Sequence, residues 1–145
     1  MTITKIISGG QTGADQGGLE AARSCGISTG GEAPLWYNTE KGSNYDLRDV
    51  YGLTESVSKS YPDRTKSNIQ NSDATIIFSK DVFSSGTQLT ERLCIGLDKP
   101  YFIYDFEDFV DREESMERFV KFGRHSTINI AGNRESVSPG IQEEV

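Results

Sequence analysis

The sequence contains few of the residues that bind metals or form covalent cross-links. Its 145 residues include two cysteines, Cys25 and Cys94, and one histidine, His125. The cysteines form no CxxC pair, and no cluster has the spacing of a zinc site. Both cysteines lie in apolar, helix-like segments, so we expect two buried free thiols in a cytoplasmic protein. His125 has no partners arranged for a catalytic triad, so we expect it to be structural or exposed.

Long hydrophobic runs and an excess of positive charge are also missing. No apolar stretch approaches the ~20 residues of a membrane span, and the N-terminus enters a strand pattern without a signal peptide. The net charge is −7, whereas nucleic-acid binding depends on neutralising many phosphates with Lys and Arg. We therefore expect no membrane and no nucleic-acid polymer as a partner. A small phosphorylated ligand is compatible, because a local field can oppose the net charge.

The sequence does contain an alternation of short apolar strands and amphipathic helices. Strands are expected at 3–8, 74–78, 101–104 and 127–130, with a further short strand at 53–57. The unbroken apolar run at 74–78 is typical of a strand covered on both faces. The alternation predicts an α/β fold, a Rossmann-like three-layer domain with a mostly parallel sheet, over residues 1–145.

Helical periodicity fills the gaps between these strands. Helices are expected at 14–24 and 63–71, after residue 87, around 109–120, and from Pro139 onward; their apolar stripes are Leu19 and Ala22, then Leu89, Leu93 and Leu97, then Phe109, Met116, Phe119 and Val120. Gly17 and Gly18 cost the first helix about 1 kcal/mol each relative to alanine. Such a cost predicts close packing of that helix on a strand or on a ligand.

Residues 30–52 have few periodic apolar positions, so we expect a long loop that is functional or mobile. Trp36 and Tyr37 lie in this loop. Their rings either stack on a ligand or pack in the core.

The strongest functional signal is the glycine-rich turn Ser8-Gly9-Gly10-Gln11-Thr12-Gly13 between the first strand and the first helix. Backbone amides in such a turn and at a helix start can form an anion site. The alternative is a tight structural turn, since the motif matches neither GxGxxG nor GxxxxGK[ST]. Asp15 follows in the first helical turn. It either compensates the helix dipole or accepts hydrogen bonds from ligand hydroxyl or amino groups.

A second turn repeats this pattern at Ser84, Ser85, Gly86 and Thr87, with ordinary helix capping as the alternative. Arg134 and Glu135 follow the last expected strand, and Arg134 could pair with a phosphate. The turns after Ser8, Phe78 and Ile130 are expected at one edge of the sheet, where ligands of such folds bind. Arg64 and Asn68 lie one helical turn apart and could face the same pocket.

The order of these motifs resembles the putative molybdenum carrier family, a branch of the SLOG superfamily. The matching segments run through most of the chain: 7–15, Gly30-Gly31 ahead of Pro34, Arg64 to Asn68 ahead of 73–75, 86–90, 129–136 and 139–141. The resemblance implies a Rossmann-like fold that binds the molybdenum cofactor or another nucleotide-like ligand, in a homo-oligomer. Two features depart from the family: Ser85 replaces a glycine, and residues 36–61 match poorly.

Related SLOG enzymes cleave nucleoside monophosphates with a glutamate three residues after the threonine of their glycine turn. In this chain that position is Thr90, and Glu91 follows it. One residue is about 100° on a helix, so Glu91 is expected to point elsewhere, which weakens the hydrolase interpretation.

Three functions are therefore compared. The first is a binding or carrier protein for a small phosphate-bearing pterin or nucleotide. The second is a sensor or sponge for a nucleotide-derived signal such as cyclic ADP-ribose. The third is a nucleotide N-glycosidase or phosphohydrolase that uses Asp15, Glu91 or Glu135 as acid or base. No catalytic or metal-binding residue is assigned, and the expected ligand-binding residues are Gly9, Gly10, Gln11, Thr12, Gly13, Asp15, Gly31, Arg64, Asn68, Ser84, Ser85, Gly86, Thr87, Arg134 and Glu135.

Overall fold

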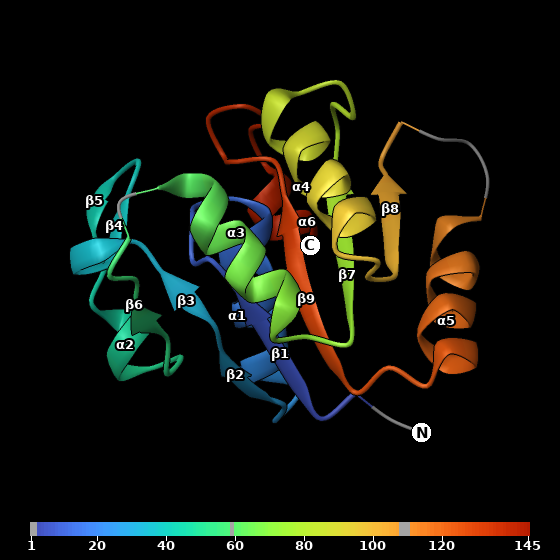
Figure 1. Ribbon diagram of the computed structural model, residues 1–145, viewed down its shortest axis with the longest axis horizontal. Coiled ribbons are helices and arrows are strands. Elements are labelled where there is room, and N and C mark those ends of the chain that lie inside the picture. Colours follow the sequence, from blue (N-terminus) through green and yellow to red (C-terminus); the bar gives the residue numbers. More distant parts are fainter. Residues whose placement is uncertain (1–2, 59, 108–110) are drawn as a thin grey trace.

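The computed structural model describes residues 3–58, 60–107 and 111–145. Its centre is a five-stranded parallel sheet in the order β2-β1-β9-β7-β8 (Figure 1). The strands are β1 (Lys5–Ser8), β2 (Ser28–Gly30), β7 (Ala74–Ser79), β8 (Tyr101–Asp105) and β9 (Thr127–Gly132). The predicted strands are confirmed except that β2 was not expected, because its three residues carry no apolar pattern.

Helices cover both faces of the sheet. The helices α1 (Ala14–Ser24), α5 (Arg112–Gly123) and α6 (Ile141–Glu144) lie on one face, and α3 (Tyr61–Gln70) and α4 (Ser85–Gly96) lie on the other (Figure 1). Side chains at the N-caps fix three of these helix starts, as Ser60, Ser84 and Asp111 each accept a hydrogen bond from a backbone amide. The predicted α/β three-layer fold is confirmed, although Phe109 of the expected 109–120 helix lies outside the described residues.

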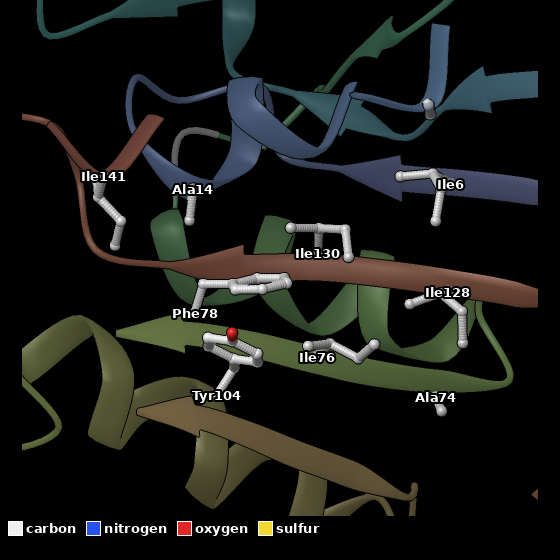
Figure 2. Close-up of a cluster of buried hydrophobic side chains, with 10 residues drawn as sticks. Ile6, Ala14, Ala74, Ile76, Phe78, Tyr104, Ile128, Ile130 and Ile141 are labelled. Atoms are coloured by element: carbon white, nitrogen blue, oxygen red, sulfur yellow. The ribbon is translucent and has the colours of Figure 1, made fainter. Parts of the chain in front are cut away.

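The main core lies between the sheet and α1. Alternate side chains of β1, β7 and β9 form it, together with Ala14 of α1 and Ile141 of α6 (Figure 2). A methyl group on Gly18 would lie 2.8 Å from Ile130, and one on Gly17 would lie 2.6 Å from the carbonyl oxygen of Gln142. The two glycines therefore let α1 approach β9 and α6, which confirms the close packing predicted from their cost.

The opposite face of the sheet is more polar, and this changes how α4 packs. Thr75 and Asn129 are neighbours in the register of β7 and β9 and are buried there. The buried residues of α4 are small, namely Thr87, Thr90 and Cys94. The leucine stripe of this helix (Leu89, Leu93 and Leu97) is only half-buried. Hydrophobic spacing alone does not reveal that the facing surface of the sheet is polar.

Residues 30–52 are not the unstructured loop that the sequence predicted, whereas the short strand expected at 53–57 is present as β6 (Thr54–Glu55). The predicted loop contains β3 (Glu32–Ala33), the 3-10 turn η1 (Leu35–Tyr37), β4 (Asn38–Thr39), β5 (Gly42–Ser43) and α2 (Asp46–Asp49). A second hydrophobic cluster holds this segment against α1; its buried members are Leu19, Ala33, Tyr37, Leu47 and Leu53. Tyr37 is therefore a core residue, whereas Trp36 is 65% exposed.

The cysteines and the histidine differ in their burial. Cys94 is buried as predicted, but the prediction for Cys25 was wrong, because this residue ends α1 at the surface. His125 is buried and its ring packs against Phe119. Over the described ranges, no helix has the length and apolar character needed to cross a membrane.

Candidate functional site

Three chain turns meet at the carboxyl edge of the sheet, as predicted. They follow β1, β9 and β7, which are adjacent in the strand order. Asn133 joins them: its side chain bonds Ser79 Oγ at 3.0 Å and Ser84 Oγ at 3.0 Å, and its carbonyl oxygen accepts a bond from Ala14 N. One buried amide therefore fixes the starts of α1 and α4 relative to the end of β7.

A cleft opens at this edge and has two parts. The inner part, of about 50 Å³, is lined among others by Asp15, Asn68, Thr90 and Asn129. The outer part, of about 540 Å³, lies against the start of α4. Tyr61, Gly132 and Arg134 line both parts, so the two parts adjoin. The volume of the outer part falls in the range of small-molecule sites.

Arginine side chains dominate the charge of the cleft. Arg64 and Arg134 place their guanidinium carbons 5.9 and 5.7 Å from the centre of the Tyr61 ring, and Arg92 lines the outer part. Among the described residues, none of the three forms an ion pair with a carboxylate. Desolvation lowers the pKa of Arg64 and raises the pKa of Tyr61. Unpaired positive charge at a cleft of an acidic protein favours an anionic ligand.

The second glycine turn supplies free backbone amides beside these arginines. Ser84 Oγ accepts a hydrogen bond from the amide of Thr87 at 3.4 Å. The side chain of Thr87 is also held, because its Oγ1 atom accepts hydrogen bonds from Ser84 Oγ and from Asn133 Nδ2. Ser84, Ser85 and Gly86 line the outer part of the cleft. Within the described chain, no protein acceptor takes the N–H groups of Ser85 and Gly86, the first two residues of α4. Ser84 and Thr87 thus shape this helix start, and its first two residues, whose amides have no acceptor in the described chain, line the outer part of the cleft.

The first glycine turn has a different arrangement. The amides of Gly10, Gln11, Thr12 and Gly13 donate to side-chain oxygens of Ser8, Asp15, Gln11 and Gln142, at 3.0–3.2 Å. Gly9 and Gln11 line the inner part of the cleft. Because four amides already have acceptors in different directions, a phosphate cradle here would require those acceptors to move. The predicted anion site in this turn stays a prediction.

Asp15 is the most perturbed acid of the cleft. Desolvation raises its pKa from 3.8 to about 7, while the Gln11 amide and the nearby Arg134 act in the opposite direction. Its Oδ2 atom accepts the amide of Gln11 at 3.2 Å. A carboxyl group that titrates near neutral pH inside a cleft is typical of binding and catalytic sites.

Glu40 is a residue of this region that the sequence did not suggest. It lies at the tip of the β4–β5 hairpin, and its carboxylate accepts hydrogen bonds from Thr12 and from the amide and hydroxyl of Ser136. These bonds, led by the one from Ser136 Oγ, lower the pKa of Glu40. These hydrogen bonds connect the hairpin to the turn after β1 and to the turn after β9. No sequence signal marks this contact, because it joins residues that are far apart in the chain.

Several predicted residues have structural partners. Asn68 bonds the backbone of Glu32 through both of its side-chain atoms while lining the inner part. A Cβ atom on Gly31 would overlap Ser8 O, so this glycine permits close backbone contact. Glu135 accepts the amides of Gly140 and Gln142 at 2.6 and 3.0 Å and so holds the start of α6. Glu91 lies beside Tyr101, whereas Thr90 lines the cleft.

Sequence reasoning missed other cleft residues, chiefly Tyr61, Arg92 and Asn129. Asn129 carried a signal, because an asparagine inside an apolar strand pattern is unusual. Tyr61 lies ahead of the helix expected at 63–71, and Arg92 looked like ordinary helix surface. No group of three or more His, Cys, Asp or Glu side chains in the described segments is placed to hold a metal ion.

Comparisons with known proteins agree with this architecture. Residues 6–145 match the model of the circularly permutated YpsA SLOG family. The chain is similar to the crystal structure of a putative molybdenum carrier protein from Syntrophus aciditrophicus SB, with 34% sequence identity and a TM-score of 0.88. That alignment covers 98% of this chain and 89% of the other. None of the curated proteins compared with the chain matched it. The chain therefore belongs to the circularly permutated YpsA family of SLOG proteins.

Proposed function

We propose that this protein binds and carries a small phosphate-bearing ligand of the nucleotide or pterin type. The observation that carries the proposal is the group of three cleft arginines, Arg64, Arg92 and Arg134, which have no carboxylate partner among the described residues. Each charge-assisted hydrogen bond to a phosphate contributes roughly 1.5–3 kcal/mol. A few such bonds are enough to bind one phosphate group despite the net charge of −7.

The phosphate is best placed in the outer part of the cleft. There the open amides of Ser85 and Gly86 and the guanidinium group of Arg134 line one space. The first glycine turn then has a different task, which is to position Asp15 through the Gln11 amide. The rest of the ligand would extend past Tyr61 into the inner part, which shares that residue.

The molybdenum cofactor is one ligand that fits this description, since it is a pterin with a phosphate group. The similar protein from Syntrophus aciditrophicus is described as a putative molybdenum carrier, which supports a carrier role for this chain. Arg134 and the amides of Ser85 and Gly86 would hold its phosphate, and Asp15 would face its ring. A cofactor bound in this way would be cargo, and it would supply its metal chemistry only after transfer.

Isothermal titration calorimetry tests the proposal with inorganic phosphate and nucleoside monophosphates as probes. We expect the natural protein to bind at least one monophosphate, and Arg134→Ala to weaken that binding tenfold or more. Arg118→Ala is the matched control, because Arg118 pairs with Glu114 on the exposed face of α5. Absence of binding by every probe, or equal binding by both variants, would contradict the proposal.

The released ligand distinguishes a carrier from a sensor. Protein purified from its source organism is heated, and the supernatant is analysed by mass spectrometry. A pterin supports the carrier, whereas an ADP-ribose species supports a sensor or sponge for such a signal.

Asp15 supports a second candidate function, hydrolysis of a nucleotide. Its pKa of about 7 suits a general acid or base at neutral pH. Chromatography of incubated nucleoside monophosphates would then reveal free base or free phosphate, and Asp15→Asn would abolish that product. If no product forms over many hours, the protein is a binder only.

We also propose a homo-oligomer. Large apolar side chains are exposed on several elements, among them Phe83, Ile95 and Phe122, and burying them against another copy would be favourable. Light scattering after gel filtration should give a multiple of 16.0 kDa; a monomer at micromolar concentration would contradict this.

A further inference from the structure

Two side-chain oxygen atoms in the inner part of the cleft, one of Asn129 and one of Asp15, accept no hydrogen bond from the described residues. Asn129 is only 2% exposed and lines this space. Its Nδ2 atom donates to Thr75 Oγ1 at 3.2 Å, and in the described chain no protein hydrogen bond uses its Oδ1 atom. Asp15 accepts the Gln11 amide with Oδ2, and no hydrogen bond within the same residues uses its Oδ1. No buried side-chain nitrogen or oxygen of the described residues lacks a partner, so these two oxygens are open to the cleft, where the donors of a ligand can reach them.

The size of the inner part limits what can enter it. Its volume of about 50 Å³ admits a group of only a few non-hydrogen atoms. Asp15 and Asn129 present acceptor oxygens to this space, so they suit a group that donates hydrogen bonds better than a phosphate, which the arginines and helix amides of the outer part can hold. The group that enters must be small and must donate hydrogen bonds.

We infer that Asp15 and Asn129 select a heterocycle whose edge carries adjacent ring N–H and exocyclic NH₂ donors. This 2-amino-4-oxopyrimidine edge is shared by guanine and pterins. A carboxylate can accept two parallel hydrogen bonds from such an edge, in the geometry that it adopts with a guanidinium group. The inference rests on the proposed function, which places the phosphate of the same ligand in the outer part.

The chemistry of the edge predicts which related ligands are rejected. Hypoxanthine keeps the ring N–H but lacks the 2-amino group, so one acceptor stays unpaired. Adenine presents a ring acceptor toward Asp15 in place of the N–H donor. An unpaired buried polar group costs roughly 1–3 kcal/mol, so both rings should bind less tightly than guanine.

Calorimetry on the full chain at pH 8 tests this with GMP, IMP, AMP and neopterin monophosphate as probes. We expect GMP or the pterin phosphate, or both, to bind at least tenfold more tightly than IMP and AMP. Binding of GMP alone would identify a guanine nucleotide, and binding of neopterin monophosphate alone would identify a pterin. Asp15→Asn should weaken GMP by a larger factor than IMP, because GMP loses the acceptor of its 2-amino group as well as the negative charge, and Asn129→Ala should reduce the same preference.

Glu20→Gln provides the matched control, since Glu20 is an exposed carboxylate on the same helix. It should keep the full preference for GMP. Equal binding of GMP, IMP and AMP, with weaker binding of 2′-deoxy-GMP, would show that Asp15 contacts the sugar and would overturn the inference alone. Absence of binding by all probes and by inorganic phosphate would overturn the proposed function and this inference together.

Discussion

At the scale of single residues, the cleft separates two kinds of polar group. Arg64 and Arg134 stack on Tyr61 at the mouth, without carboxylate partners among the described residues. Asp15 lies deeper, where desolvation raises its pKa to about 7. Hydrogen bonds donated by a ligand would offset the desolvation free energy of this carboxyl group, because they replace the hydrogen bonds lost from water.

Asp15 also makes stability depend on pH. Its pKa in the folded state is raised from 3.8 to about 7, so the folded protein holds the proton more tightly than the unfolded chain. The contribution of the protonated Asp15 to the free energy of unfolding is complete below pH 3.8, and it is lost as the pH rises through about 7. An asparagine does not titrate, so the Asp15→Asn variant does not lose stability in this way as the pH rises. We expect its free energy of unfolding, relative to the natural protein, to increase by about 1–3 kcal/mol between pH 5 and pH 8.

Urea denaturation at the two pH values measures this difference. Glu20→Gln, on the exposed side of the same helix, should change by less than about 0.5 kcal/mol over the same range. A variant Asp15→Asn that is less stable than the natural protein at pH 8 would show that the carboxylate is favourably bound.

At the scale of elements, small residues decide how closely the helices approach the sheet. At Gly18, α1 lies so close to β9 that a methyl group there would overlap the side chain of Ile130. On the opposite face, α4 packs through Thr87, Thr90 and Cys94. This close approach brings the start of α4 to the cleft, where Asn133 binds Ser84.

Substitution of two glycines tests the packing of α1. Gly18→Ala should lower the free energy of unfolding by about 1–3 kcal/mol, because the added methyl group meets Ile130. Gly96→Ala is the control: it also lies in a helix, and a Cβ atom there has no neighbour within 4 Å. It should be neutral or raise stability by up to about 1 kcal/mol. Equal effects of the two substitutions in urea denaturation would contradict the role given to Gly18.

At the scale of the whole molecule, local patterns were enough to predict the fold and the edge of the sheet where the glycine turns meet. The apolar run 74–78 and the turn 8–13 are signals contained within a few residues, and β7 and the β1–α1 turn lie where they predicted. The buried face of α4 and the elements within 32–49 could not be predicted in this way. They depend on what packs opposite, namely the polar Asn129 and the small cluster around Leu47. The contact of Glu40 with Ser136 likewise exists only after folding.

The central claim is that a ligand phosphate binds at the start of α4 beside Arg134. A crystal structure of the protein grown with a nucleoside monophosphate, GMP or AMP, tests it most directly. The account predicts phosphate oxygens about 2.7–3.1 Å from the amides of Ser85 and Gly86 and from the Arg134 guanidinium group. A phosphate bound instead within the turn 9–13, with the Glu40 carboxylate displaced, or bound outside the cleft, would contradict it.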